Sequence, residues 1–185
     1  MSETCLTEIS SGEETDFSIK KKSSNKLRSN EKILNSIIKI LNQLLEQNKK
    51  LPNYKNILKH QSKNTFSLKK IPQIDIESFL KRINKYCEPE ISTLIVSLIY
   101  IDKFCIDGDI VISEYNIHRI LLASIFLSLK YNEDILFSTK YYSKIFGIHI
   151  KELILLERKF LEIINFNVFV SDNIYEQYSN YLKKQ

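Results

Sequence analysis

The side chains of this 185-residue sequence that could do chemistry do not form a catalytic pattern. The three histidines, His60, His118 and His149, lie in different segments without the spacing of metal ligands. No serine or cysteine has a recognisable base in a motif, and the sequence contains no glycine-rich phosphate loop. An enzyme is therefore the weakest class, and His118 is interpreted as a helix-start or core histidine. We expect no cofactor, no metal and no small-molecule substrate.

Two carboxylates are unusual because each lies in the middle of an otherwise apolar helix face. At about 100° per residue, Glu157 falls at the centre of a stripe near 150–164 and Asp102 at the centre of one over 91–106. The apolar members are Ile150, Leu153, Ile154, Phe160, Leu161 and Ile164 in one stripe, and Ile91, Ile95, Leu98, Ile99, Cys105 and Ile106 in the other. A buried carboxylate without a partner is strongly destabilising, so each needs a cation or access to water.

Lys130 is the candidate partner of Glu157, and either Arg82 or Arg119 is the candidate partner of Asp102. Such pairs could serve only to lock helices together. A lysine at the end of a helix also interacts favourably with the helix dipole, which is a second structural explanation of Lys130. The functional alternative is that Lys130 and Glu157 lie at a rim, where they present opposite charges to the backbone of a partner.

Helices are predicted to position these charges. Only three glycines and three prolines interrupt the chain, and a hydrophobic content of 43% can supply one core. From Ile117 to Leu129 every residue except His118 and Arg119 is apolar or small, which predicts a helix buried among other helices. Periodicity and caps predict helices over 31–47, 75–87, 90–105, 113–130, 139–146 and 149–165, with a last helix after Ser171.

The organisation that follows is all-α. We predict a disordered tail over 1–29, an amphipathic helix within 30–48, a solvated Lys/Asn-rich linker over 49–71, a helical bundle over 72–170 and a C-terminal helix over 171–185. The helix near 31–47 is expected to lie on the bundle.

Charge argues against nucleic acid as the partner. The net charge is +5, but residues 1–70 carry a balance of +7 and residues 71–185 a balance of −2. The basic residues therefore precede the bundle instead of forming a face on it. The tyrosines Tyr175, Tyr178 and Tyr181 could stack on bases, but their helical spacing favours packing.

The sequence predicts an intracellular protein of the nucleus, the cytoplasm or both. Cys5, Cys87 and Cys105 are far apart and odd in number, which argues against a disulfide framework or a zinc site. No apolar run is long enough to span a membrane, and the acidic N-terminus is unlike a signal peptide.

Five segments in order resemble a known family. They are FLKRINKY, SLIYIDKF, EYNIHRILLASIFLSLKYNED, KYYSKIFGI and KELILLERKFLEIINFNV, and they cover about 73–170. This set resembles the cyclin box, in particular the P-type or U-type cyclins related to the phosphate-pathway cyclins of fungi. The matching positions are His118, Arg119, Lys130, Glu133, Asp134, Tyr142, Lys144, Gly147, Glu152, Leu153, Leu156, Glu157, Phe160 and Leu161. The resemblance implies a single cyclin box, a five-helix bundle around a buried central helix.

The resemblance further implies a non-enzymatic subunit that binds and activates a cyclin-dependent kinase. Lys130 and Glu157 would grip the kinase beside its regulatory helix, and the apolar neighbours would be Leu127, Tyr131, Leu161, Phe166 and Val168. Arg82 and Asp102 would form an internal ion pair by the same analogy. The helix before the box could complete the kinase interface.

The sequence departs from the family pattern at several points. Tyr131 replaces a common phenylalanine, Phe146 replaces a usual glycine, and the substrate-docking motif of cell-cycle cyclins is missing. The alternative function is a cyclin-fold scaffold, or a transcription-factor-like nucleic-acid-binding module, without a kinase partner. The charge balance and the pair of Lys130 and Glu157 favour the kinase.

Overall fold

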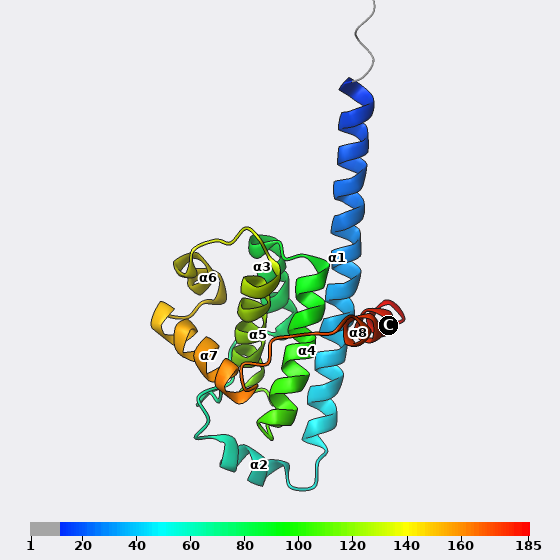
Figure 1. Ribbon diagram of the computed structural model, residues 1–185. Helices are drawn as coiled ribbons and strands as arrows, with labels where there is room; N and C mark the ends of the chain where they lie inside the picture. The colour runs from blue at the N-terminus through cyan, green and yellow to red at the C-terminus, as the bar shows by residue number, and fades with distance from the viewer. Residues whose placement is uncertain (1–11) are drawn as a thin grey trace, which may run out of the picture.

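The computed structural model describes the backbone from Gly12 to Gln185 and the side chains from Glu31 onward (Figure 1). Its elements in that range are helices without a strand, which confirms the all-α prediction. The helices are α1 Gly12–Lys49, α2 Tyr54–Gln61, α3 Ile76–Cys87, α4 Ile91–Asp107, α5 Ile117–Asn132, α6 Thr139–Phe146, α7 Ile150–Ile163 and α8 Asp172–Lys183. The five helices predicted for the bundle correspond to α3 to α7.

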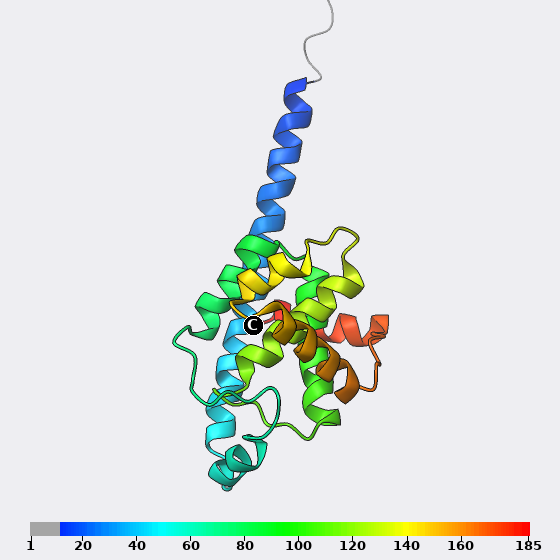
Figure 2. The same ribbon diagram turned by 90° about the vertical axis from the view of Figure 1, so that its left-hand side faces the viewer.

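The centre of the bundle is α5, as its composition predicts. Every residue from Ile117 to Leu129 except Arg119 is buried. The helix packs between α4, which runs beside it, and α7, which is inclined to it (Figures 1 and 2). An apolar surface on all sides is stable only when neighbouring helices cover it.

A second helix, α4, is also buried on most of its surface, which the sequence analysis did not predict. It contacts α1, α5, α7 and α8. The predicted apolar stripe was wrong at its end, because Ile106 is 78% exposed while Phe104 is fully buried. With several neighbours around α4, no single stripe defines its buried side.

The C-terminal half of α1 lies on the bundle, where it packs against α3, α4 and α8. Its buried stripe consists of Ile33, Leu34, Ile37, Ile38, Leu41 and Leu45. The helix begins at Gly12, so residues 12–29 are helical where composition predicted disorder, and they project beyond the bundle (Figure 1). Adding a residue to an existing helix is far easier than nucleating one, and the packed stripe provides that nucleus. Residues 1–11 of the predicted tail lie outside the described residues.

The segment predicted as a solvated linker, 49–71, is part of the fold. It contains α2, and Phe66 is fully buried. The ring of Phe66 lies 4.7 Å from that of Phe104 and 6.2 Å from that of Phe160, and the last two rings stack at 4.5 Å. One aromatic residue among polar neighbours therefore anchors this segment to α4 and α7.

Short polar contacts fix the ends of the helices that cover α5. The Asp75 carboxylate accepts from the Ser78 amide at 2.6 Å and caps α3, while the Ser138 hydroxyl accepts from the Tyr141 amide and caps α6. Gly147 ends α6 with a φ of 72°, a conformation that glycine adopts readily. Within residues 12–185, no helix is both long enough and apolar enough to cross a membrane.

We expect Phe66→Ala to lower the free energy of unfolding by about 3–5 kcal/mol, because it leaves a cavity beside Phe104 and Phe160. Leu51→Ala in the same segment is the matched control, since Leu51 is exposed and its truncation should change stability by about 0.5 kcal/mol or less. Urea denaturation followed by circular dichroism measures both. Equal stabilities for the two variants would show that the segment does not contribute to the core.

Candidate functional site

The structure brings Lys130 and Glu157 together at the surface of the bundle. Lys130 lies in the last turn of α5, and Glu157 lies in the middle of α7. The Lys130 Nζ donates to Glu157 Oε1 at 2.5 Å, with side chains that are 44% and 13% exposed respectively. The same ammonium lies 5.3 Å from the centroid of the Phe126 ring, which adds a cation–π contact. The pair is therefore held in place yet open to solvent on the lysine side.

Apolar side chains surround this pair and remain uncovered. Tyr131 follows Lys130 and is 51% exposed, and Ile154, three residues before Glu157 on α7, is exposed. Of the other predicted contact residues, Leu127 is buried beneath the surface, while Leu161 and Val168 are half-buried. The exposure of Ile154 differs from the prediction, because the helical position of this side chain assigned it to the buried stripe.

The segment after α7 presents Phe166 beside α4. The Phe166 ring is 65% exposed, and its φ of 56° is unusual for a bulky residue. The Tyr100 hydroxyl donates to the Val168 carbonyl at 2.7 Å, and the Lys103 Nζ donates to the Phe169 carbonyl at 2.8 Å. An exposed aromatic ring on a strained backbone that the fold holds in place is typical of a binding surface.

Glu133 has a structural task that the sequence did not reveal. Its Oε1 accepts from the Glu90 amide at 2.8 Å and from the Thr93 hydroxyl at 2.7 Å. The carboxylate thus satisfies the N-terminus of α4 and ties it to the end of α5, next to Lys130. This contact fixes the C-terminal end of α5, where Lys130 and Tyr131 lie.

The predicted ion pair of Arg82 and Asp102 was wrong. Asp102 instead accepts a 2.5 Å hydrogen bond from the hydroxyl of Tyr178 on α8. Burial raises the pKa of Asp102, and the hydrogen bond from Tyr178 partly opposes that rise. A neutral hydroxyl therefore replaces the expected cation, and the predicted packing role of the C-terminal tyrosines holds for Tyr175 and Tyr178.

The two arginines considered for Asp102 lie together elsewhere. Arg119 pairs with Glu152 on α7 and donates to the Thr65 carbonyl at 2.8 Å. Arg82 lies near the end of α6, with its Nη2 3.5 Å from the Phe146 carbonyl oxygen. The sequence could not show which residues Arg82 and Arg119 contact, because loops separate the arginines from those residues along the chain.

The described residues contain no cluster of three or more His, Cys, Asp or Glu side chains that could hold a metal ion. Burial raises the pKa of both the Cys87 and the Cys105 thiols to about 12, which makes them poor nucleophiles. His149 caps α7, since its Nδ1 accepts from the Lys151 amide.

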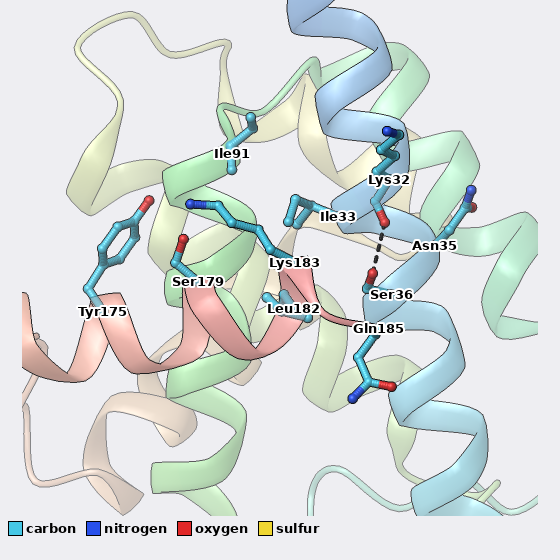
Figure 3. Close-up of a pocket in the computed structure, with 10 residues that line it drawn as sticks. All are labelled: Lys32, Ile33, Asn35, Ser36, Ile91, Tyr175, Ser179, Leu182, Lys183 and Gln185. Carbon is cyan, nitrogen blue, oxygen red and sulfur yellow. Dashed lines mark hydrogen bonds between the residues drawn. The ribbon is translucent and has the colours of Figure 1, made fainter.

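A pocket of about 840 Å³ lies between α1, α8 and the start of α4 (Figure 3). Figure 3 shows Lys32 on α1 and Lys183 on α8, with Ile33 between their side chains and Leu182 on α8 below Lys183. Tyr175 and Ser179 complete the α8 side. These residues do not form an acid–base pair or a ligand set, so the pocket does not change the assignment of the site.

The comparison with family models decides the family. The model described as Cyclin matches residues 15–168. The chain belongs to the cyclin family. The match begins well before residue 72, the predicted start of the cyclin box, and so includes most of α1.

The relatives confirm the predicted resemblance to P-type or U-type cyclins. Cyclin-U2-1 of Arabidopsis thaliana is 33% identical over 121 residues, which are 65% of this chain and 54% of the relative. The PHO85 cyclin-like protein psl1 of Schizosaccharomyces pombe is 34% identical over 119 residues, 63% of this chain and 49% of the relative. PHO85 cyclin-7 of Saccharomyces cerevisiae is 30% identical over 128 residues, 63% of this chain and 45% of the relative. The chain spans about half the length of these relatives.

We expect Tyr178→Phe to destabilise this cyclin by about 1–3 kcal/mol at neutral pH, because Asp102 then lacks its buried donor. Tyr181→Phe is the control, since the Tyr181 ring is exposed and loses only a surface hydroxyl. Chemical denaturation at neutral pH measures the difference between the two variants.

The pH dependence of stability tests the same contact. The pKa of Asp102 in the folded state is raised above its ordinary value of 3.8, so the folded state retains a proton that the unfolded state has lost. Stability should therefore fall as the pH rises from 3.8 through the raised pKa, and Asp102→Asn should remove this part of the fall. Identical pH profiles for the wild type and Asp102→Asn would contradict the raised pKa.

Proposed function

We propose that this cyclin is a regulatory subunit that binds and activates a cyclin-dependent protein kinase through the surface around Lys130 and Glu157. The observation that carries the proposal is the uncovered apolar rim around a half-buried ion pair. Family membership and the names of two relatives, a PHO85 cyclin and a PHO85 cyclin-like protein, support a kinase partner. This role predicts an intracellular location, in the nucleus or the cytoplasm.

The two charges suit the recognition of a partner's backbone. Among the described residues, Lys130 uses one of its donors on Glu157, and that bond engages only Oε1 of the carboxylate. The remaining donors of the ammonium can bind carbonyl oxygens, while Glu157 Oε2 can accept from amides. A partner segment that offers both groups would be gripped at two points and oriented.

Apolar contacts would supply most of the binding energy. Tyr131 and Phe166 offer two exposed aromatic rings, the residue type enriched at interface hot spots. Leu161 lies half-buried on α7 and Val168 in the segment after it, and Leu127 supports the surface from below. A helix of the kinase with an apolar face would cover these rings.

Activation would be a shift in population, with no chemistry by this chain. Docking against the regulatory helix would stabilise the kinase conformer in which the helix glutamate pairs with the ATP-site lysine. The cyclin shifts that equilibrium only as far as it binds the active conformer more tightly than the inactive one.

The double variant Lys130→Ala with Glu157→Ala should bind the kinase at least about tenfold more weakly, because the grip on the backbone is lost. The measurement is capture of kinases from native cell extract by the immobilised wild type and variant. Circular dichroism establishes that each variant is folded.

Lys159→Ala with Glu162→Ala provides the matched control. That pair also lies on α7, with a 2.6 Å contact between exposed side chains, so its removal deletes the same charges away from the rim. We expect it to capture the kinase as the wild type does. Equal capture by both double variants would show that the Lys130 pair only joins helices, and capture of nucleic acid without a kinase would support the alternative function.

A further inference from the structure

Residues 49–70 carry charge of a single sign. The range contains seven lysines and no aspartate or glutamate. All seven are exposed, and together they are called the lysine surface below: Lys49, Lys50, Lys55, Lys59, Lys63, Lys69 and Lys70. Lys49 pairs with Glu46 at 2.8 Å and with Glu114 at 2.6 Å, whereas the other six lysines form no ion pair within residues 31–185. Most of this charge is therefore available to a partner.

The helix α2 presents part of the lysine surface at one end of the molecule. It lies beyond the ends of the other helices in Figures 1 and 2, and none of its residues is fully buried. Lys55 and Lys59 are exposed on its outer side, while Tyr54, Ile57 and Leu58 are half-buried. A short basic helix with one apolar side at the surface is typical of proteins that lie on membranes.

Contacts with the bundle hold the lysine surface in place. Phe66 is fully buried, and the Leu68 amide donates to the Tyr115 carbonyl at 2.8 Å. The Ser67 hydroxyl donates to the Gln61 carbonyl at 2.8 Å, which ties the end of α2 to the segment that follows. The lysines are thus presented by an ordered backbone, so binding does not have to order it first.

Fewer carboxylates than lysines lie at this end of the molecule. Glu46 and Glu114 both pair with Lys49, and Asp107 and Asp109 lie where α4 ends. Seven lysines against these four carboxylates leave a difference of +3. Such a balance attracts an anionic surface over a distance of about 8 Å at physiological salt.

A pocket of about 300 Å³ lies within the lysine surface, between α2 and the segments 67–69 and 113–115. Lys59 and Lys69 line it together with Ser62 and Tyr115, and no acidic residue lines it. The two ammonium groups and the Tyr115 hydroxyl are hydrogen-bond donors that suit a phosphate group, which offers several acceptor oxygens. The volume leaves room for the alcohol part of a lipid headgroup beside the phosphate.

We propose that the lysine surface attaches this protein to the anionic face of a phospholipid membrane, with one lipid phosphate bound in the pocket between Lys59 and Lys69. Each lysine close to such a membrane adds an attraction to the anionic lipids. Leu51 and Ile71 are exposed at the two ends of the segment, where they can enter the boundary between headgroups and acyl chains.

Two features favour a membrane over nucleic acid. Residues 49–70 contain no arginine, the residue whose planar guanidinium binds phosphates and bases in a bidentate manner. The lysine surface also lies at a projecting end of the molecule, and the N-terminal half of α1 projects at the opposite end (Figure 1). A flat layer of headgroups can therefore meet α2 without obstruction by α1.

This attachment goes beyond kinase binding and does not depend on it. The segment after α2 contacts Tyr115, just before α5 begins at Ile117, whereas Lys130 lies in the last turn of α5. Thirteen residues of helix place these two ends about 20 Å apart. A kinase on Lys130 and Glu157 would leave α2 free to contact a membrane.

The test is co-sedimentation of the full chain with vesicles at low salt. One set of vesicles contains phosphatidylcholine alone, and the other contains phosphatidylcholine mixed with phosphatidylserine. We expect binding to the mixed vesicles only, and a decrease of that binding as the salt concentration rises. Lys59→Gln with Lys69→Gln should bind the mixed vesicles at least about tenfold more weakly, because both charges at the phosphate are lost.

Two further double variants remove the same charge elsewhere. Lys140→Gln with Lys144→Gln deletes two exposed lysines of α6 and should bind within about twofold of the wild type. Lys55→Gln with Lys63→Gln removes two lysines that do not line the pocket, so its affinity should fall between those of the wild type and the pocket variant. All the substituted lysines are exposed, and circular dichroism and thermal unfolding should match the wild type.

Four results would overturn the proposal in whole or in part. Absence of binding to the mixed vesicles, or equal binding by the wild type and the pocket variant, would exclude the membrane site. Equal losses in the two lysine-surface variants would exclude the bound phosphate. Displacement of the protein from mixed vesicles by a DNA duplex at equal phosphate concentration would make nucleic acid the partner. Kinase capture by the pocket variant should equal that of the wild type, which keeps this test separate from that of the kinase surface.

Discussion

The structure depends on burying a helix that is apolar on every side. From Ile117 to Leu129 only Arg119 escapes burial, so α5 can be stable only when other helices enclose it. The caps at Asp75 and Ser138, the aromatic contact of Phe66 and the bond of Glu133 to the start of α4 all hold the surrounding elements in place. Each of these contacts serves the enclosure of α5.

The same constraint limits where α5 can act. A helix enclosed along its length meets solvent or a partner only near its two ends. At one end Lys130 reaches out between Glu157 and the ring of Phe126. At the other end His118 and Arg119 meet Arg82 beside a pocket. The charged side chains of this helix, Arg119 and Lys130, are therefore found where the enclosing helices stop.

Much of the fold could be predicted from sequence because helical periodicity is a local signal. The six helices from α3 to α8 lie close to their predicted ranges, and the apolar run of α5 correctly indicated that this helix is buried. The role of Phe66 could not be predicted, since a single aromatic residue has no periodicity. The extension of α1 to Gly12 was missed because composition measures the ability to form a core and not the ability to lengthen a packed helix.

The charged residues of the candidate site could be predicted because each is unusual on its own helix, whereas the partner of Asp102 could not be predicted. Glu157 stood out by its position on its own helix, and Lys130 by its place at the end of α5. The donor to Asp102 came from Tyr178, a residue seventy-six positions away, because α8 returns across α4. Charge pairing suggested an arginine, but a hydroxyl can satisfy a carboxylate that folding leaves partly buried.

The return of α8 to α1 has a consequence for synthesis of the chain. Leu182 is buried and α8 packs against α1, so part of the α1 stripe is covered by the last helix of the sequence. At roughly 5–20 residues per second, α8 is made about 7–30 seconds after α1. During that interval the apolar stripe of α1 is incompletely covered on the nascent chain, where it is open to chaperones and to premature association.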